Sequence, residues 1–227
     1  MRRGEAQDRL NEQFARVAKA VAHPKRVELI SLLEQGERGV DDLARAIGMG
    51  VTATSSHLQI LRRARLLESR REGSRVLYRV AGDQVTRFLG ALRDLAAEQL
   101  AEVDQVLRDY FGTRDDLEPV GVSELWRRLS NGDIVVLDVR PASEFAEGHI
   151  PAARSIPLDE LEARLAEIPE EAEVIAYCRG PFCVLAPEAV AVLRGHGRRA
   201  RRLDSGVPQW RLAGLPVAVG TPDGRRH

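Results

Sequence analysis

The sequence EVIAYCRGPFCVLAPEAVAVL, at residues 173–193, decides the fold of the second half of the chain. Its first part, Glu173–Tyr177, is a short apolar run with two adjacent β-branched residues, which is typical of a buried parallel strand. Its last part, Val184–Leu193, has proline and glutamate where both favour the first turn of a helix. The order of strand, loop and helix predicts an α/β domain in which Cys178–Cys183 forms the loop.

This loop holds Cys178 and Cys183, the only cysteines in the 227-residue sequence. A loop between a strand and a helix directs several backbone N–H groups and a positive helix end at one point, which favours an anionic thiolate or persulfide. We therefore predict that Cys178 is the catalytic nucleophile. The predicted anion cradle around it consists of Arg179, Gly180, Pro181, Phe182 and Cys183.

Three residues of the cradle shape its expected chemistry. Arg179 directly follows the nucleophile, so its charge favours the thiolate and attracts an anionic donor. Pro181 has no backbone N–H to contribute. Cys183 is either a second thiol that resolves a sulfur species on Cys178 or a small buried apolar residue.

Length and charge distribution predict two domains. Residues 1–82 contain 16 basic and 10 acidic residues, residues 83–118 contain 4 and 9, and residues 119–227 contain 14 and 15. A basic first third favours an anionic partner, most simply nucleic acid. Only two of the 34 basic residues are lysines, so a genome-wide preference for arginine is an alternative source of this bias.

The sequence has neither an apolar run of about 20 residues, which a membrane span requires, nor the apolar core of a signal peptide near its start. These features predict a cytoplasmic protein without membrane contact. In that reducing compartment, two cysteines five positions apart favour catalytic, redox or sensing chemistry over a structural disulfide.

The basic part predicts four helices and a hairpin. Apolar spacing, aspartates at helix starts and breaks at proline or glycine place the helices at residues 5–21, 24–35, 41–48 and 52–65. Residues 66–71 and 75–80 read as two strands joined by a tight turn.

The fourth helix has two faces of different character. Leu58 and Leu61 mark its core face, whereas polar residues form a stripe suited to base edges in a major groove. The hairpin carries arginines suited to phosphates. The predicted DNA-binding residues are Thr52, Thr54, Ser55, Ser56, His57, Gln59, Arg70, Arg71 and Arg75.

Residues 10–111 resemble the ArsR-type winged helix-turn-helix repressors. The resemblance is carried by the stretches Ala22–Val27, Thr54–Leu61 and Gly73–Tyr78. It implies an operator in double-stranded DNA as the partner. Many members of that family bind metals through cysteines in the third helix or through histidines and carboxylates in the last helix. The matching segments here have no cysteine and no histidine, so no metal site is expected.

Residues 83–111 repeat apolar residues at helical spacing and predict one long amphipathic helix whose seam requires a partner helix. The resemblance implies that this helix and the first one form a homodimer interface. Packing within a single chain is the alternative. A polar linker is predicted at residues 112–118.

The remaining sequence predicts a helix at 122–129, a buried strand at 134–139, a helix at 158–168 and a last strand near 200–203. Residues 119–219 resemble the rhodanese domain, a sulfurtransferase module. The carrying stretches are Leu137–Arg140 with Glu144 and Phe145, Gly148–Ala153, Ser155–Leu158, the Cys178 loop and Gly206–Trp210. The resemblance implies that the loop cysteine alone carries sulfur, and that Asp138, Arg140, Glu144 and His149 hold the fold.

Loop length separates sulfur transfer from related reactions. A phosphatase or arsenate reductase on a related fold is expected to close a seven-residue loop with an arginine, whereas Val184 and Leu185 stand at the seventh and eighth positions counted from Cys178. The sequence therefore favours sulfur transfer.

These observations predict a multidomain protein: a mainly α winged helix-turn-helix domain at 1–111, a linker at 112–118, an α/β rhodanese-like domain with a parallel sheet at 119–221, and a tail at 222–227. The predicted function is a DNA-binding transcriptional regulator that senses or transfers sulfane sulfur through Cys178, supplied by thiosulfate, polysulfide or a persulfide, without a cofactor. The alternative is a sulfurtransferase with an accessory DNA-binding domain.

Overall fold

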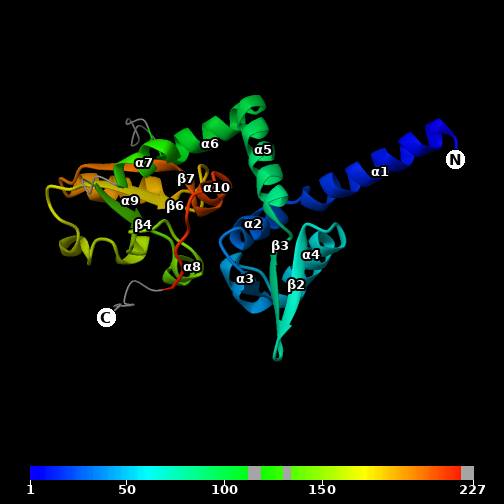
Figure 1. The fold of residues 1–227 in the computed structure, drawn as a ribbon, viewed down its shortest axis with the longest axis horizontal. Coiled ribbons are helices and arrows are strands. Elements are labelled where there is room, and N and C mark those ends of the chain that lie inside the picture. The colour runs from blue at the N-terminus through cyan, green and yellow to red at the C-terminus, as the bar shows by residue number, and fades with distance from the viewer. Residues whose placement is uncertain (112–118, 130–133, 221–227) are drawn as a thin grey trace. The chain divides into compact units, whose positions relative to one another are not determined.

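The computed structural model describes residues 1–111, 119–129 and 134–220, so the predicted linker at 112–118 and the tail at 222–227 lie outside the described residues. The chain divides into two compact units, Met1–Arg93 and Asp94–His227. The predicted fold class, a mainly α unit with a hairpin followed by an α/β unit with a parallel sheet, is confirmed (Figure 1). The division between the units falls inside a helix, whereas the sequence predicts it after residue 111.

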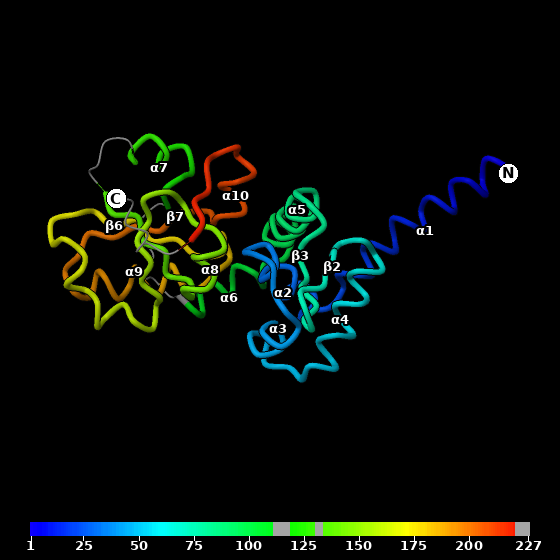
Figure 2. Tube along the Cα trace, turned by 60° about the horizontal axis from the view of Figure 1, so that its bottom comes forward, coloured from blue at the N-terminus to red at the C-terminus, as the bar shows by residue number. Residues whose placement is uncertain are grey.

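The first unit has the predicted helix-turn-helix and hairpin. Its elements are α1 (Arg3–Val21), α2 (Pro24–Leu33), β1 (Arg38–Gly39), α3 (Val40–Ala46), α4 (Val51–Arg63), β2 (Leu67–Glu72), β3 (Arg75–Val80) and the first part of α5 (Asp83–Gln99). Helix α4 packs directly on α2 and α3, and the strands β2 and β3 lie beside these helices (Figure 2). Strand β1 adds a third antiparallel strand beside β3, and its two residues are too few to form a recognisable sequence pattern.

One apolar core holds this unit together. Leu58 and Leu61 of α4 are fully buried there with residues of α2 and α3. Each buried leucine side chain contributes about 1.5–3 kcal/mol relative to exposure. The hairpin turns at Gly73, whose φ of +60° favours glycine. The core therefore fixes the face of α4 that points away from it.

The prediction of one continuous helix at 83–111 is wrong. Helix α5 ends at Gln99, and a separate helix α6 (Ala101–Phe111) begins after Leu100. Apolar periodicity continues across the break because both helices are amphipathic. Leu100 is 51% exposed, so it does not lie in a packed seam of the chain itself.

The second unit is built on a parallel four-stranded sheet in the order β5-β4-β6-β7. Besides α6 it contains α7 (Val122–Leu129), β4 (Ile134–Asp138), α8 (Ala142–Glu147), β5 (Arg154–Ser155), the 3₁₀ turns η1 (Leu158–Glu160) and η2 (Leu165–Glu167), β6 (Glu173–Cys178), α9 (Leu185–Gly195), β7 (Ala200–Gly206) and α10 (Val207–Leu212).

Helices cover both faces of this sheet. Alternate residues of β6 point to opposite sides: Val174, Ala176 and Cys178 pack toward α9, and Ile175 and Tyr177 pack toward α7, α8 and α10. This two-sided burial explains why β4 and β6 are continuously apolar. It also places the sulfur of Cys178 on the α9 side of the sheet.

The predicted helix at 158–168 is replaced by η1 and η2. Leu161 and Ile168 are buried at helical spacing, which produced the helix prediction. Arg164 instead pairs with Glu160 at 2.8 Å and Glu167 at 2.7 Å across two short turns. Tertiary packing has therefore overridden a weak local preference.

No helix in the described part of the chain is long and apolar enough to cross a membrane.

Candidate functional site

The Cys178 loop lies at the carboxyl end of β6, an inner strand with β4 on one side and β7 on the other. Cys178 is the last residue of β6, and Leu185 begins α9. The order of strand, loop and helix around the two cysteines is thus as predicted. Ligands of open parallel sheets bind at this end of the strands, so the loop occupies the usual place for chemistry in such a fold.

Glycines shape the loop. The Cys183 N–H donates to the Gly180 carbonyl at 3.1 Å, which closes a tight turn, and Gly180 has a φ of +150°. Gly206 passes so close that a Cβ there would lie 2.6 Å from the Cys178 carbonyl oxygen. Any larger residue at position 206 would push the loop away from the end of β7.

The two thiols form a hydrogen-bonded pair. Cys178 is 2% exposed, and burial raises the pKa of its thiol well above the usual value. The hydrogen bond from the Cys178 thiol, together with the N–H groups of Arg179 and Leu185, lowers the pKa of Cys183 to about 6. The sequence predicts the thiolate on Cys178, whereas in the structure burial raises the pKa of that thiol and the surrounding hydrogen bonds lower the pKa of Cys183.

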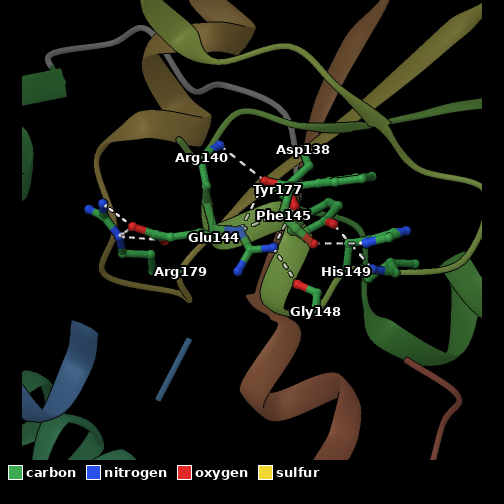
Figure 3. Close-up of polar contacts among 9 residues, drawn as sticks. Asp138, Arg140, Glu144, Phe145, Gly148, His149, Tyr177 and Arg179 are labelled. Atoms are coloured by element: carbon green, nitrogen blue, oxygen red, sulfur yellow. Dashed lines mark hydrogen bonds and ion pairs between the residues drawn. The ribbon is translucent and has the colours of Figure 1, made fainter. Parts of the chain in front are cut away.

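Arg179 is held by a buried carboxylate. Its guanidinium makes bonds of 2.7–3.2 Å to both oxygens of Glu144, whose side chain is fully buried on α8. Figure 3 shows the two side chains directed toward each other. Burial makes an unpaired carboxylate costly, so the pair fixes a positive charge beside the loop. The rhodanese resemblance implies only a fold-holding role for Glu144, and no local sequence pattern predicts its pairing with Arg179 across 35 positions.

A second buried ion pair supports the same end of the sheet. The Arg140 guanidinium lies 2.5 Å from Asp138, both side chains are fully buried, and Arg140 also donates to the Gly148 carbonyl at 2.8 Å (Figure 3). The Tyr177 hydroxyl accepts the Ile150 N–H at 3.1 Å. These bonds connect three segments of backbone, which is the fold-holding role that the rhodanese resemblance implies.

His149 belongs to this support as well. Its ring stacks on Phe145 with centroids 3.6 Å apart, and its Nδ1 lies 2.9 Å from the Phe145 carbonyl oxygen. These side chains therefore hold the loop in place, and Cys178 and Cys183 are its free thiols.

The predicted DNA-contacting residues of α4 do not all lie on one surface. Thr52 and Ser56 are exposed, and Ser55 and Gln59 are partly exposed. Thr54 is fully buried, and its hydroxyl donates to the Gly50 carbonyl at 3.1 Å. The assignment of Thr54 to DNA is therefore wrong, because its side chain faces the core at the spacing of Leu58.

His57 and Gln59 have partners within the first unit. The His57 ring lies 4.5 Å from the ring of His23, and burial, with the nearby charges of His23 and Arg26, lowers the pKa of His57. Gln59 donates to the Tyr78 hydroxyl at 3.4 Å, which connects α4 to β3. Both residues are therefore partly engaged in packing.

The arginines of the hairpin differ in their pairing. Arg70 forms ion pairs with Glu37 at 2.6 Å and Glu72 at 2.8 Å, and the hydrogen bonds from Glu37 and Glu72 raise its pKa. Arg71 and Arg75 are exposed and form no ion pair within the described residues. Phosphate contact would require Arg70 to leave its carboxylates.

Comparisons with known proteins agree with the division of the chain into a winged helix-turn-helix part and an α/β part. Residues 23–69 match the family "Bacterial regulatory protein, arsR family", and residues 121–213 match the family "Rhodanese-like domain". The HTH-type transcriptional regulator Rv0324 of Mycobacterium tuberculosis is 46% identical over 215 residues, which cover 95% of this chain and 94% of that protein.

Other relatives match only one of the two parts of the chain. A sulfurtransferase of Allochromatium vinosum is 33% identical over 98 residues, 43% of this chain and 89% of that protein. The solution structure of the homodimeric winged helix-turn-helix domain Mb0332 of Mycobacterium bovis is 44% identical, with a TM-score of 0.40, and covers 41% of this chain and 87% of that one.

Proposed function

Because the chain belongs to the ArsR family of bacterial transcriptional regulators and carries a rhodanese-like domain, we propose that it binds operator DNA as a homodimer and senses sulfane sulfur through Cys178. It acts in the cytoplasm, where its DNA partner is found. The DNA-binding half is the output of this regulator, and the cysteine loop is its input. The donor is an anionic sulfane-sulfur compound such as thiosulfate, polysulfide or a low-molecular-weight persulfide.

The observation that carries the proposal is the thiol pair beside a fixed positive charge. The Cys178 thiol donates to the Cys183 carbonyl oxygen at 3.6 Å and its interaction with the Cys183 sulfur lowers the pKa of Cys183, while the guanidinium of Arg179 is held next to both cysteines by Glu144. A nucleophile within hydrogen-bond reach of a base is the usual arrangement for covalent catalysis. The thiolate of Cys183 can accept the proton of Cys178 as Cys178 attacks.

The first step balances with thiosulfate as donor. The Cys178 sulfur forms a bond to the outer sulfur of thiosulfate, the S–S bond of thiosulfate breaks, and sulfite leaves with the electron pair. The proton of Cys178 passes to Cys183. The products are a Cys178 persulfide, a Cys183 thiol and sulfite.

The second step uses Cys183 as the resolving thiol. Its sulfur attacks the inner sulfur of the Cys178 persulfide, and hydrosulfide leaves with the proton of Cys183. Both cysteines are oxidised to a disulfide, and the sulfane sulfur is reduced to sulfide. With a longer chain of sulfur atoms on Cys178, attack of Cys183 on a sulfur further from Cys178 leaves the nearer sulfur atoms in the link and releases the remainder as hydrosulfide or a shorter polysulfide.

Operator contact is assigned to the exposed polar residues of α4 and to the unpaired arginines of the hairpin. Thr52, Ser55 and Ser56 read base edges, and Arg71 and Arg75 contact phosphates. Homodimer formation is assigned to exposed apolar residues of α1 and α5, among them Phe14, which is 65% exposed, and Leu95, which is 56% exposed.

The similarity to a sulfurtransferase over 98 residues supports a second candidate, in which sulfur transfer is the main activity and DNA binding serves to autoregulate or localise the protein. The two candidates differ in turnover. A regulator needs one modification for each response, whereas an enzyme passes sulfur to an acceptor many times.

Two assays on the same protein separate the candidates. One measures thiosulfate:cyanide sulfurtransferase turnover, and the other measures binding to the promoter region of its own gene with and without polysulfide. The regulator proposal expects promoter binding that polysulfide changes. Rapid turnover without promoter binding would support the enzyme and contradict the regulator.

A further inference from the structure

A contact joins the last turn of α6 to the first turn of α9. The Tyr110 hydroxyl donates a hydrogen bond to a carboxylate oxygen of Glu188, a residue 78 positions further along the chain. Both residues belong to the second unit. No sequence motif predicts that these two side chains meet, so the contact is visible only in the structure.

The first turn of α9 also holds the sulfur atoms. Leu185 and Ala186 pack in one apolar cluster with Cys178 and Cys183, and their backbone N–H groups favour the thiolate forms of Cys183 and Cys178 respectively. Glu188 lies in the same turn, which its own N–H closes by donating to the Val184 carbonyl at 3.2 Å. One helical turn therefore binds both thiols through its backbone and Tyr110 through a side chain.

The surroundings of Tyr110 give it room to move. Beside it lies a groove of about 660 Å³ between α6, η1 and α9, and the Tyr110 side chain is 53% exposed. The groove is lined by Tyr110, Leu158, Asp159, Glu162, Pro187, Glu188, Ala191 and Val192. Leu158 packs into the same apolar cluster as Cys178, so the groove wall and the thiol share one core.

We propose that the Tyr110–Glu188 hydrogen bond couples the sulfur state of the Cys178 loop to α6, and through α6 to the DNA-binding unit. This inference rests on the proposed function and names the contact that connects the Cys178 loop to the DNA-binding unit. When Cys178 and Cys183 form a link, the N–H group of Leu185 no longer faces the Cys183 thiolate and that of Ala186 no longer faces the Cys178 thiol. The first turn of α9 then shifts, and Glu188 no longer accepts from Tyr110.

Coupling requires that the contact differ between the two sulfur states, because a contact of equal strength in both shifts no equilibrium. Helix α6 follows α5 after the single residue Leu100, so a change at Tyr110 has a short covalent path to α5. The contact is thus placed to favour the reduced state over the linked state.

The test compares wild type, Tyr110→Phe, Glu188→Gln and the control Glu162→Gln, which removes a negative charge from the same groove. For each protein, mass spectrometry measures sulfur uptake at the cysteines, and promoter binding is measured before and after polysulfide. We expect equal sulfur uptake in all four. The polysulfide response of DNA affinity should shrink by about tenfold in Tyr110→Phe and Glu188→Gln, the factor that one hydrogen bond to a charged group supplies, and should stay at the wild-type value in Glu162→Gln.

The outcomes distinguish a failure of the proposed function from a failure of the coupling alone. A wild type that takes up sulfur but keeps its DNA affinity contradicts the proposed function, and the coupling fails with it. A wild type that responds, together with a Tyr110→Phe protein that responds equally, overturns the coupling alone. A response lost equally in Glu162→Gln also overturns it, because groove charge and not the hydrogen bond would then carry the signal.

Discussion

At the scale of residues, the molecule keeps its reactive and its supporting groups separate. The reactive pair, Cys178 and Cys183, sits in a loop, and buried ion pairs such as Asp138 with Arg140 hold the surrounding backbone. Both ion pairs, Asp138 with Arg140 and Glu144 with Arg179, are neutralised, and the two free thiols are left as the reactive groups. This separation makes the two groups testable by different measurements.

The thiol pair should titrate as a hydrogen-bonded unit. Thiolates react with iodoacetamide and thiols do not, so the alkylation rate of the reduced protein should rise with pH through a midpoint at about 6, the pKa of Cys183. Cys178→Ala removes the hydrogen-bond donor, and the midpoint should move to higher pH. In Cys183→Ala, the buried Cys178 should react slowly at pH 7.

A midpoint that stays near pH 6 in Cys178→Ala would show that the backbone N–H groups alone stabilise the thiolate. A fast reaction in Cys183→Ala at pH 7 would instead place the charge on Cys178.

Asp138→Asn should destabilise the second unit by about 3–5 kcal/mol, because it leaves the Arg140 guanidinium buried without its countercharge. Both tryptophans of the chain, Trp126 and Trp210, lie in that unit, so urea unfolding followed by tryptophan fluorescence reports on it. Glu160→Gln is the control, since its pair with Arg164 lies in the same unit, is partly exposed and should contribute less than about 1 kcal/mol. Equal effects of the two substitutions would contradict this account.

At the scale of elements, α4 and the hairpin are assigned different parts of DNA recognition. Thr52→Ala or Ser56→Ala should reduce discrimination between operator and unrelated DNA by about 1–3 kcal/mol. Arg71→Ala or Arg75→Ala should weaken binding to all sequences and lower the slope of log K against log salt by about 1. Fluorescence anisotropy over a salt series measures both quantities.

Arg70→Ala is the matched control, because Glu37 and Glu72 already neutralise that arginine, and the slope should change less than for Arg71. Hairpin variants that altered operator preference without changing the salt slope would reverse the assigned roles.

Local patterns predicted some elements well and others poorly. The strand, loop and helix around Cys178 were predictable because two-sided burial and helix-start residues leave clear local signals. The burial of Thr54 could have been read from its spacing with Leu58 and Leu61 on one helix face. In contrast, the pairing of Arg179 with Glu144 depends on contacts distant in sequence. The order in which the two thiols lose protons depends on burial, which no local pattern contains.

At the scale of the whole molecule, the exposed apolar residues of α1 and α5 should hold the dimer together, and DNA affinity should depend on that dimer. Phe14→Asp or Leu95→Asp places a charge at an exposed apolar position and should convert the dimer to a monomer of 25.1 kDa. Affinity for the promoter should fall sharply, because only a dimer fixes the spacing of two recognition helices. Leu92 is a poor choice for this test, since it packs against the core of the first unit.

Light scattering measures the mass of each variant in solution and so tells a dimer from a monomer. A dimer of unchanged mass in both would place the interface elsewhere, and a monomer that still bound operator at full affinity would disconnect dimer formation from DNA recognition.

The central claim is that sulfur chemistry at Cys178 controls DNA binding. Its most direct test is promoter affinity of wild type, Cys178→Ser and Cys183→Ser, each measured with and without polysulfide. The account predicts a full response in wild type alone, no response in Cys178→Ser, and sulfur uptake with a slow or absent response in Cys183→Ser. A Cys178→Ser protein that still changed its DNA affinity on polysulfide treatment would contradict the claim.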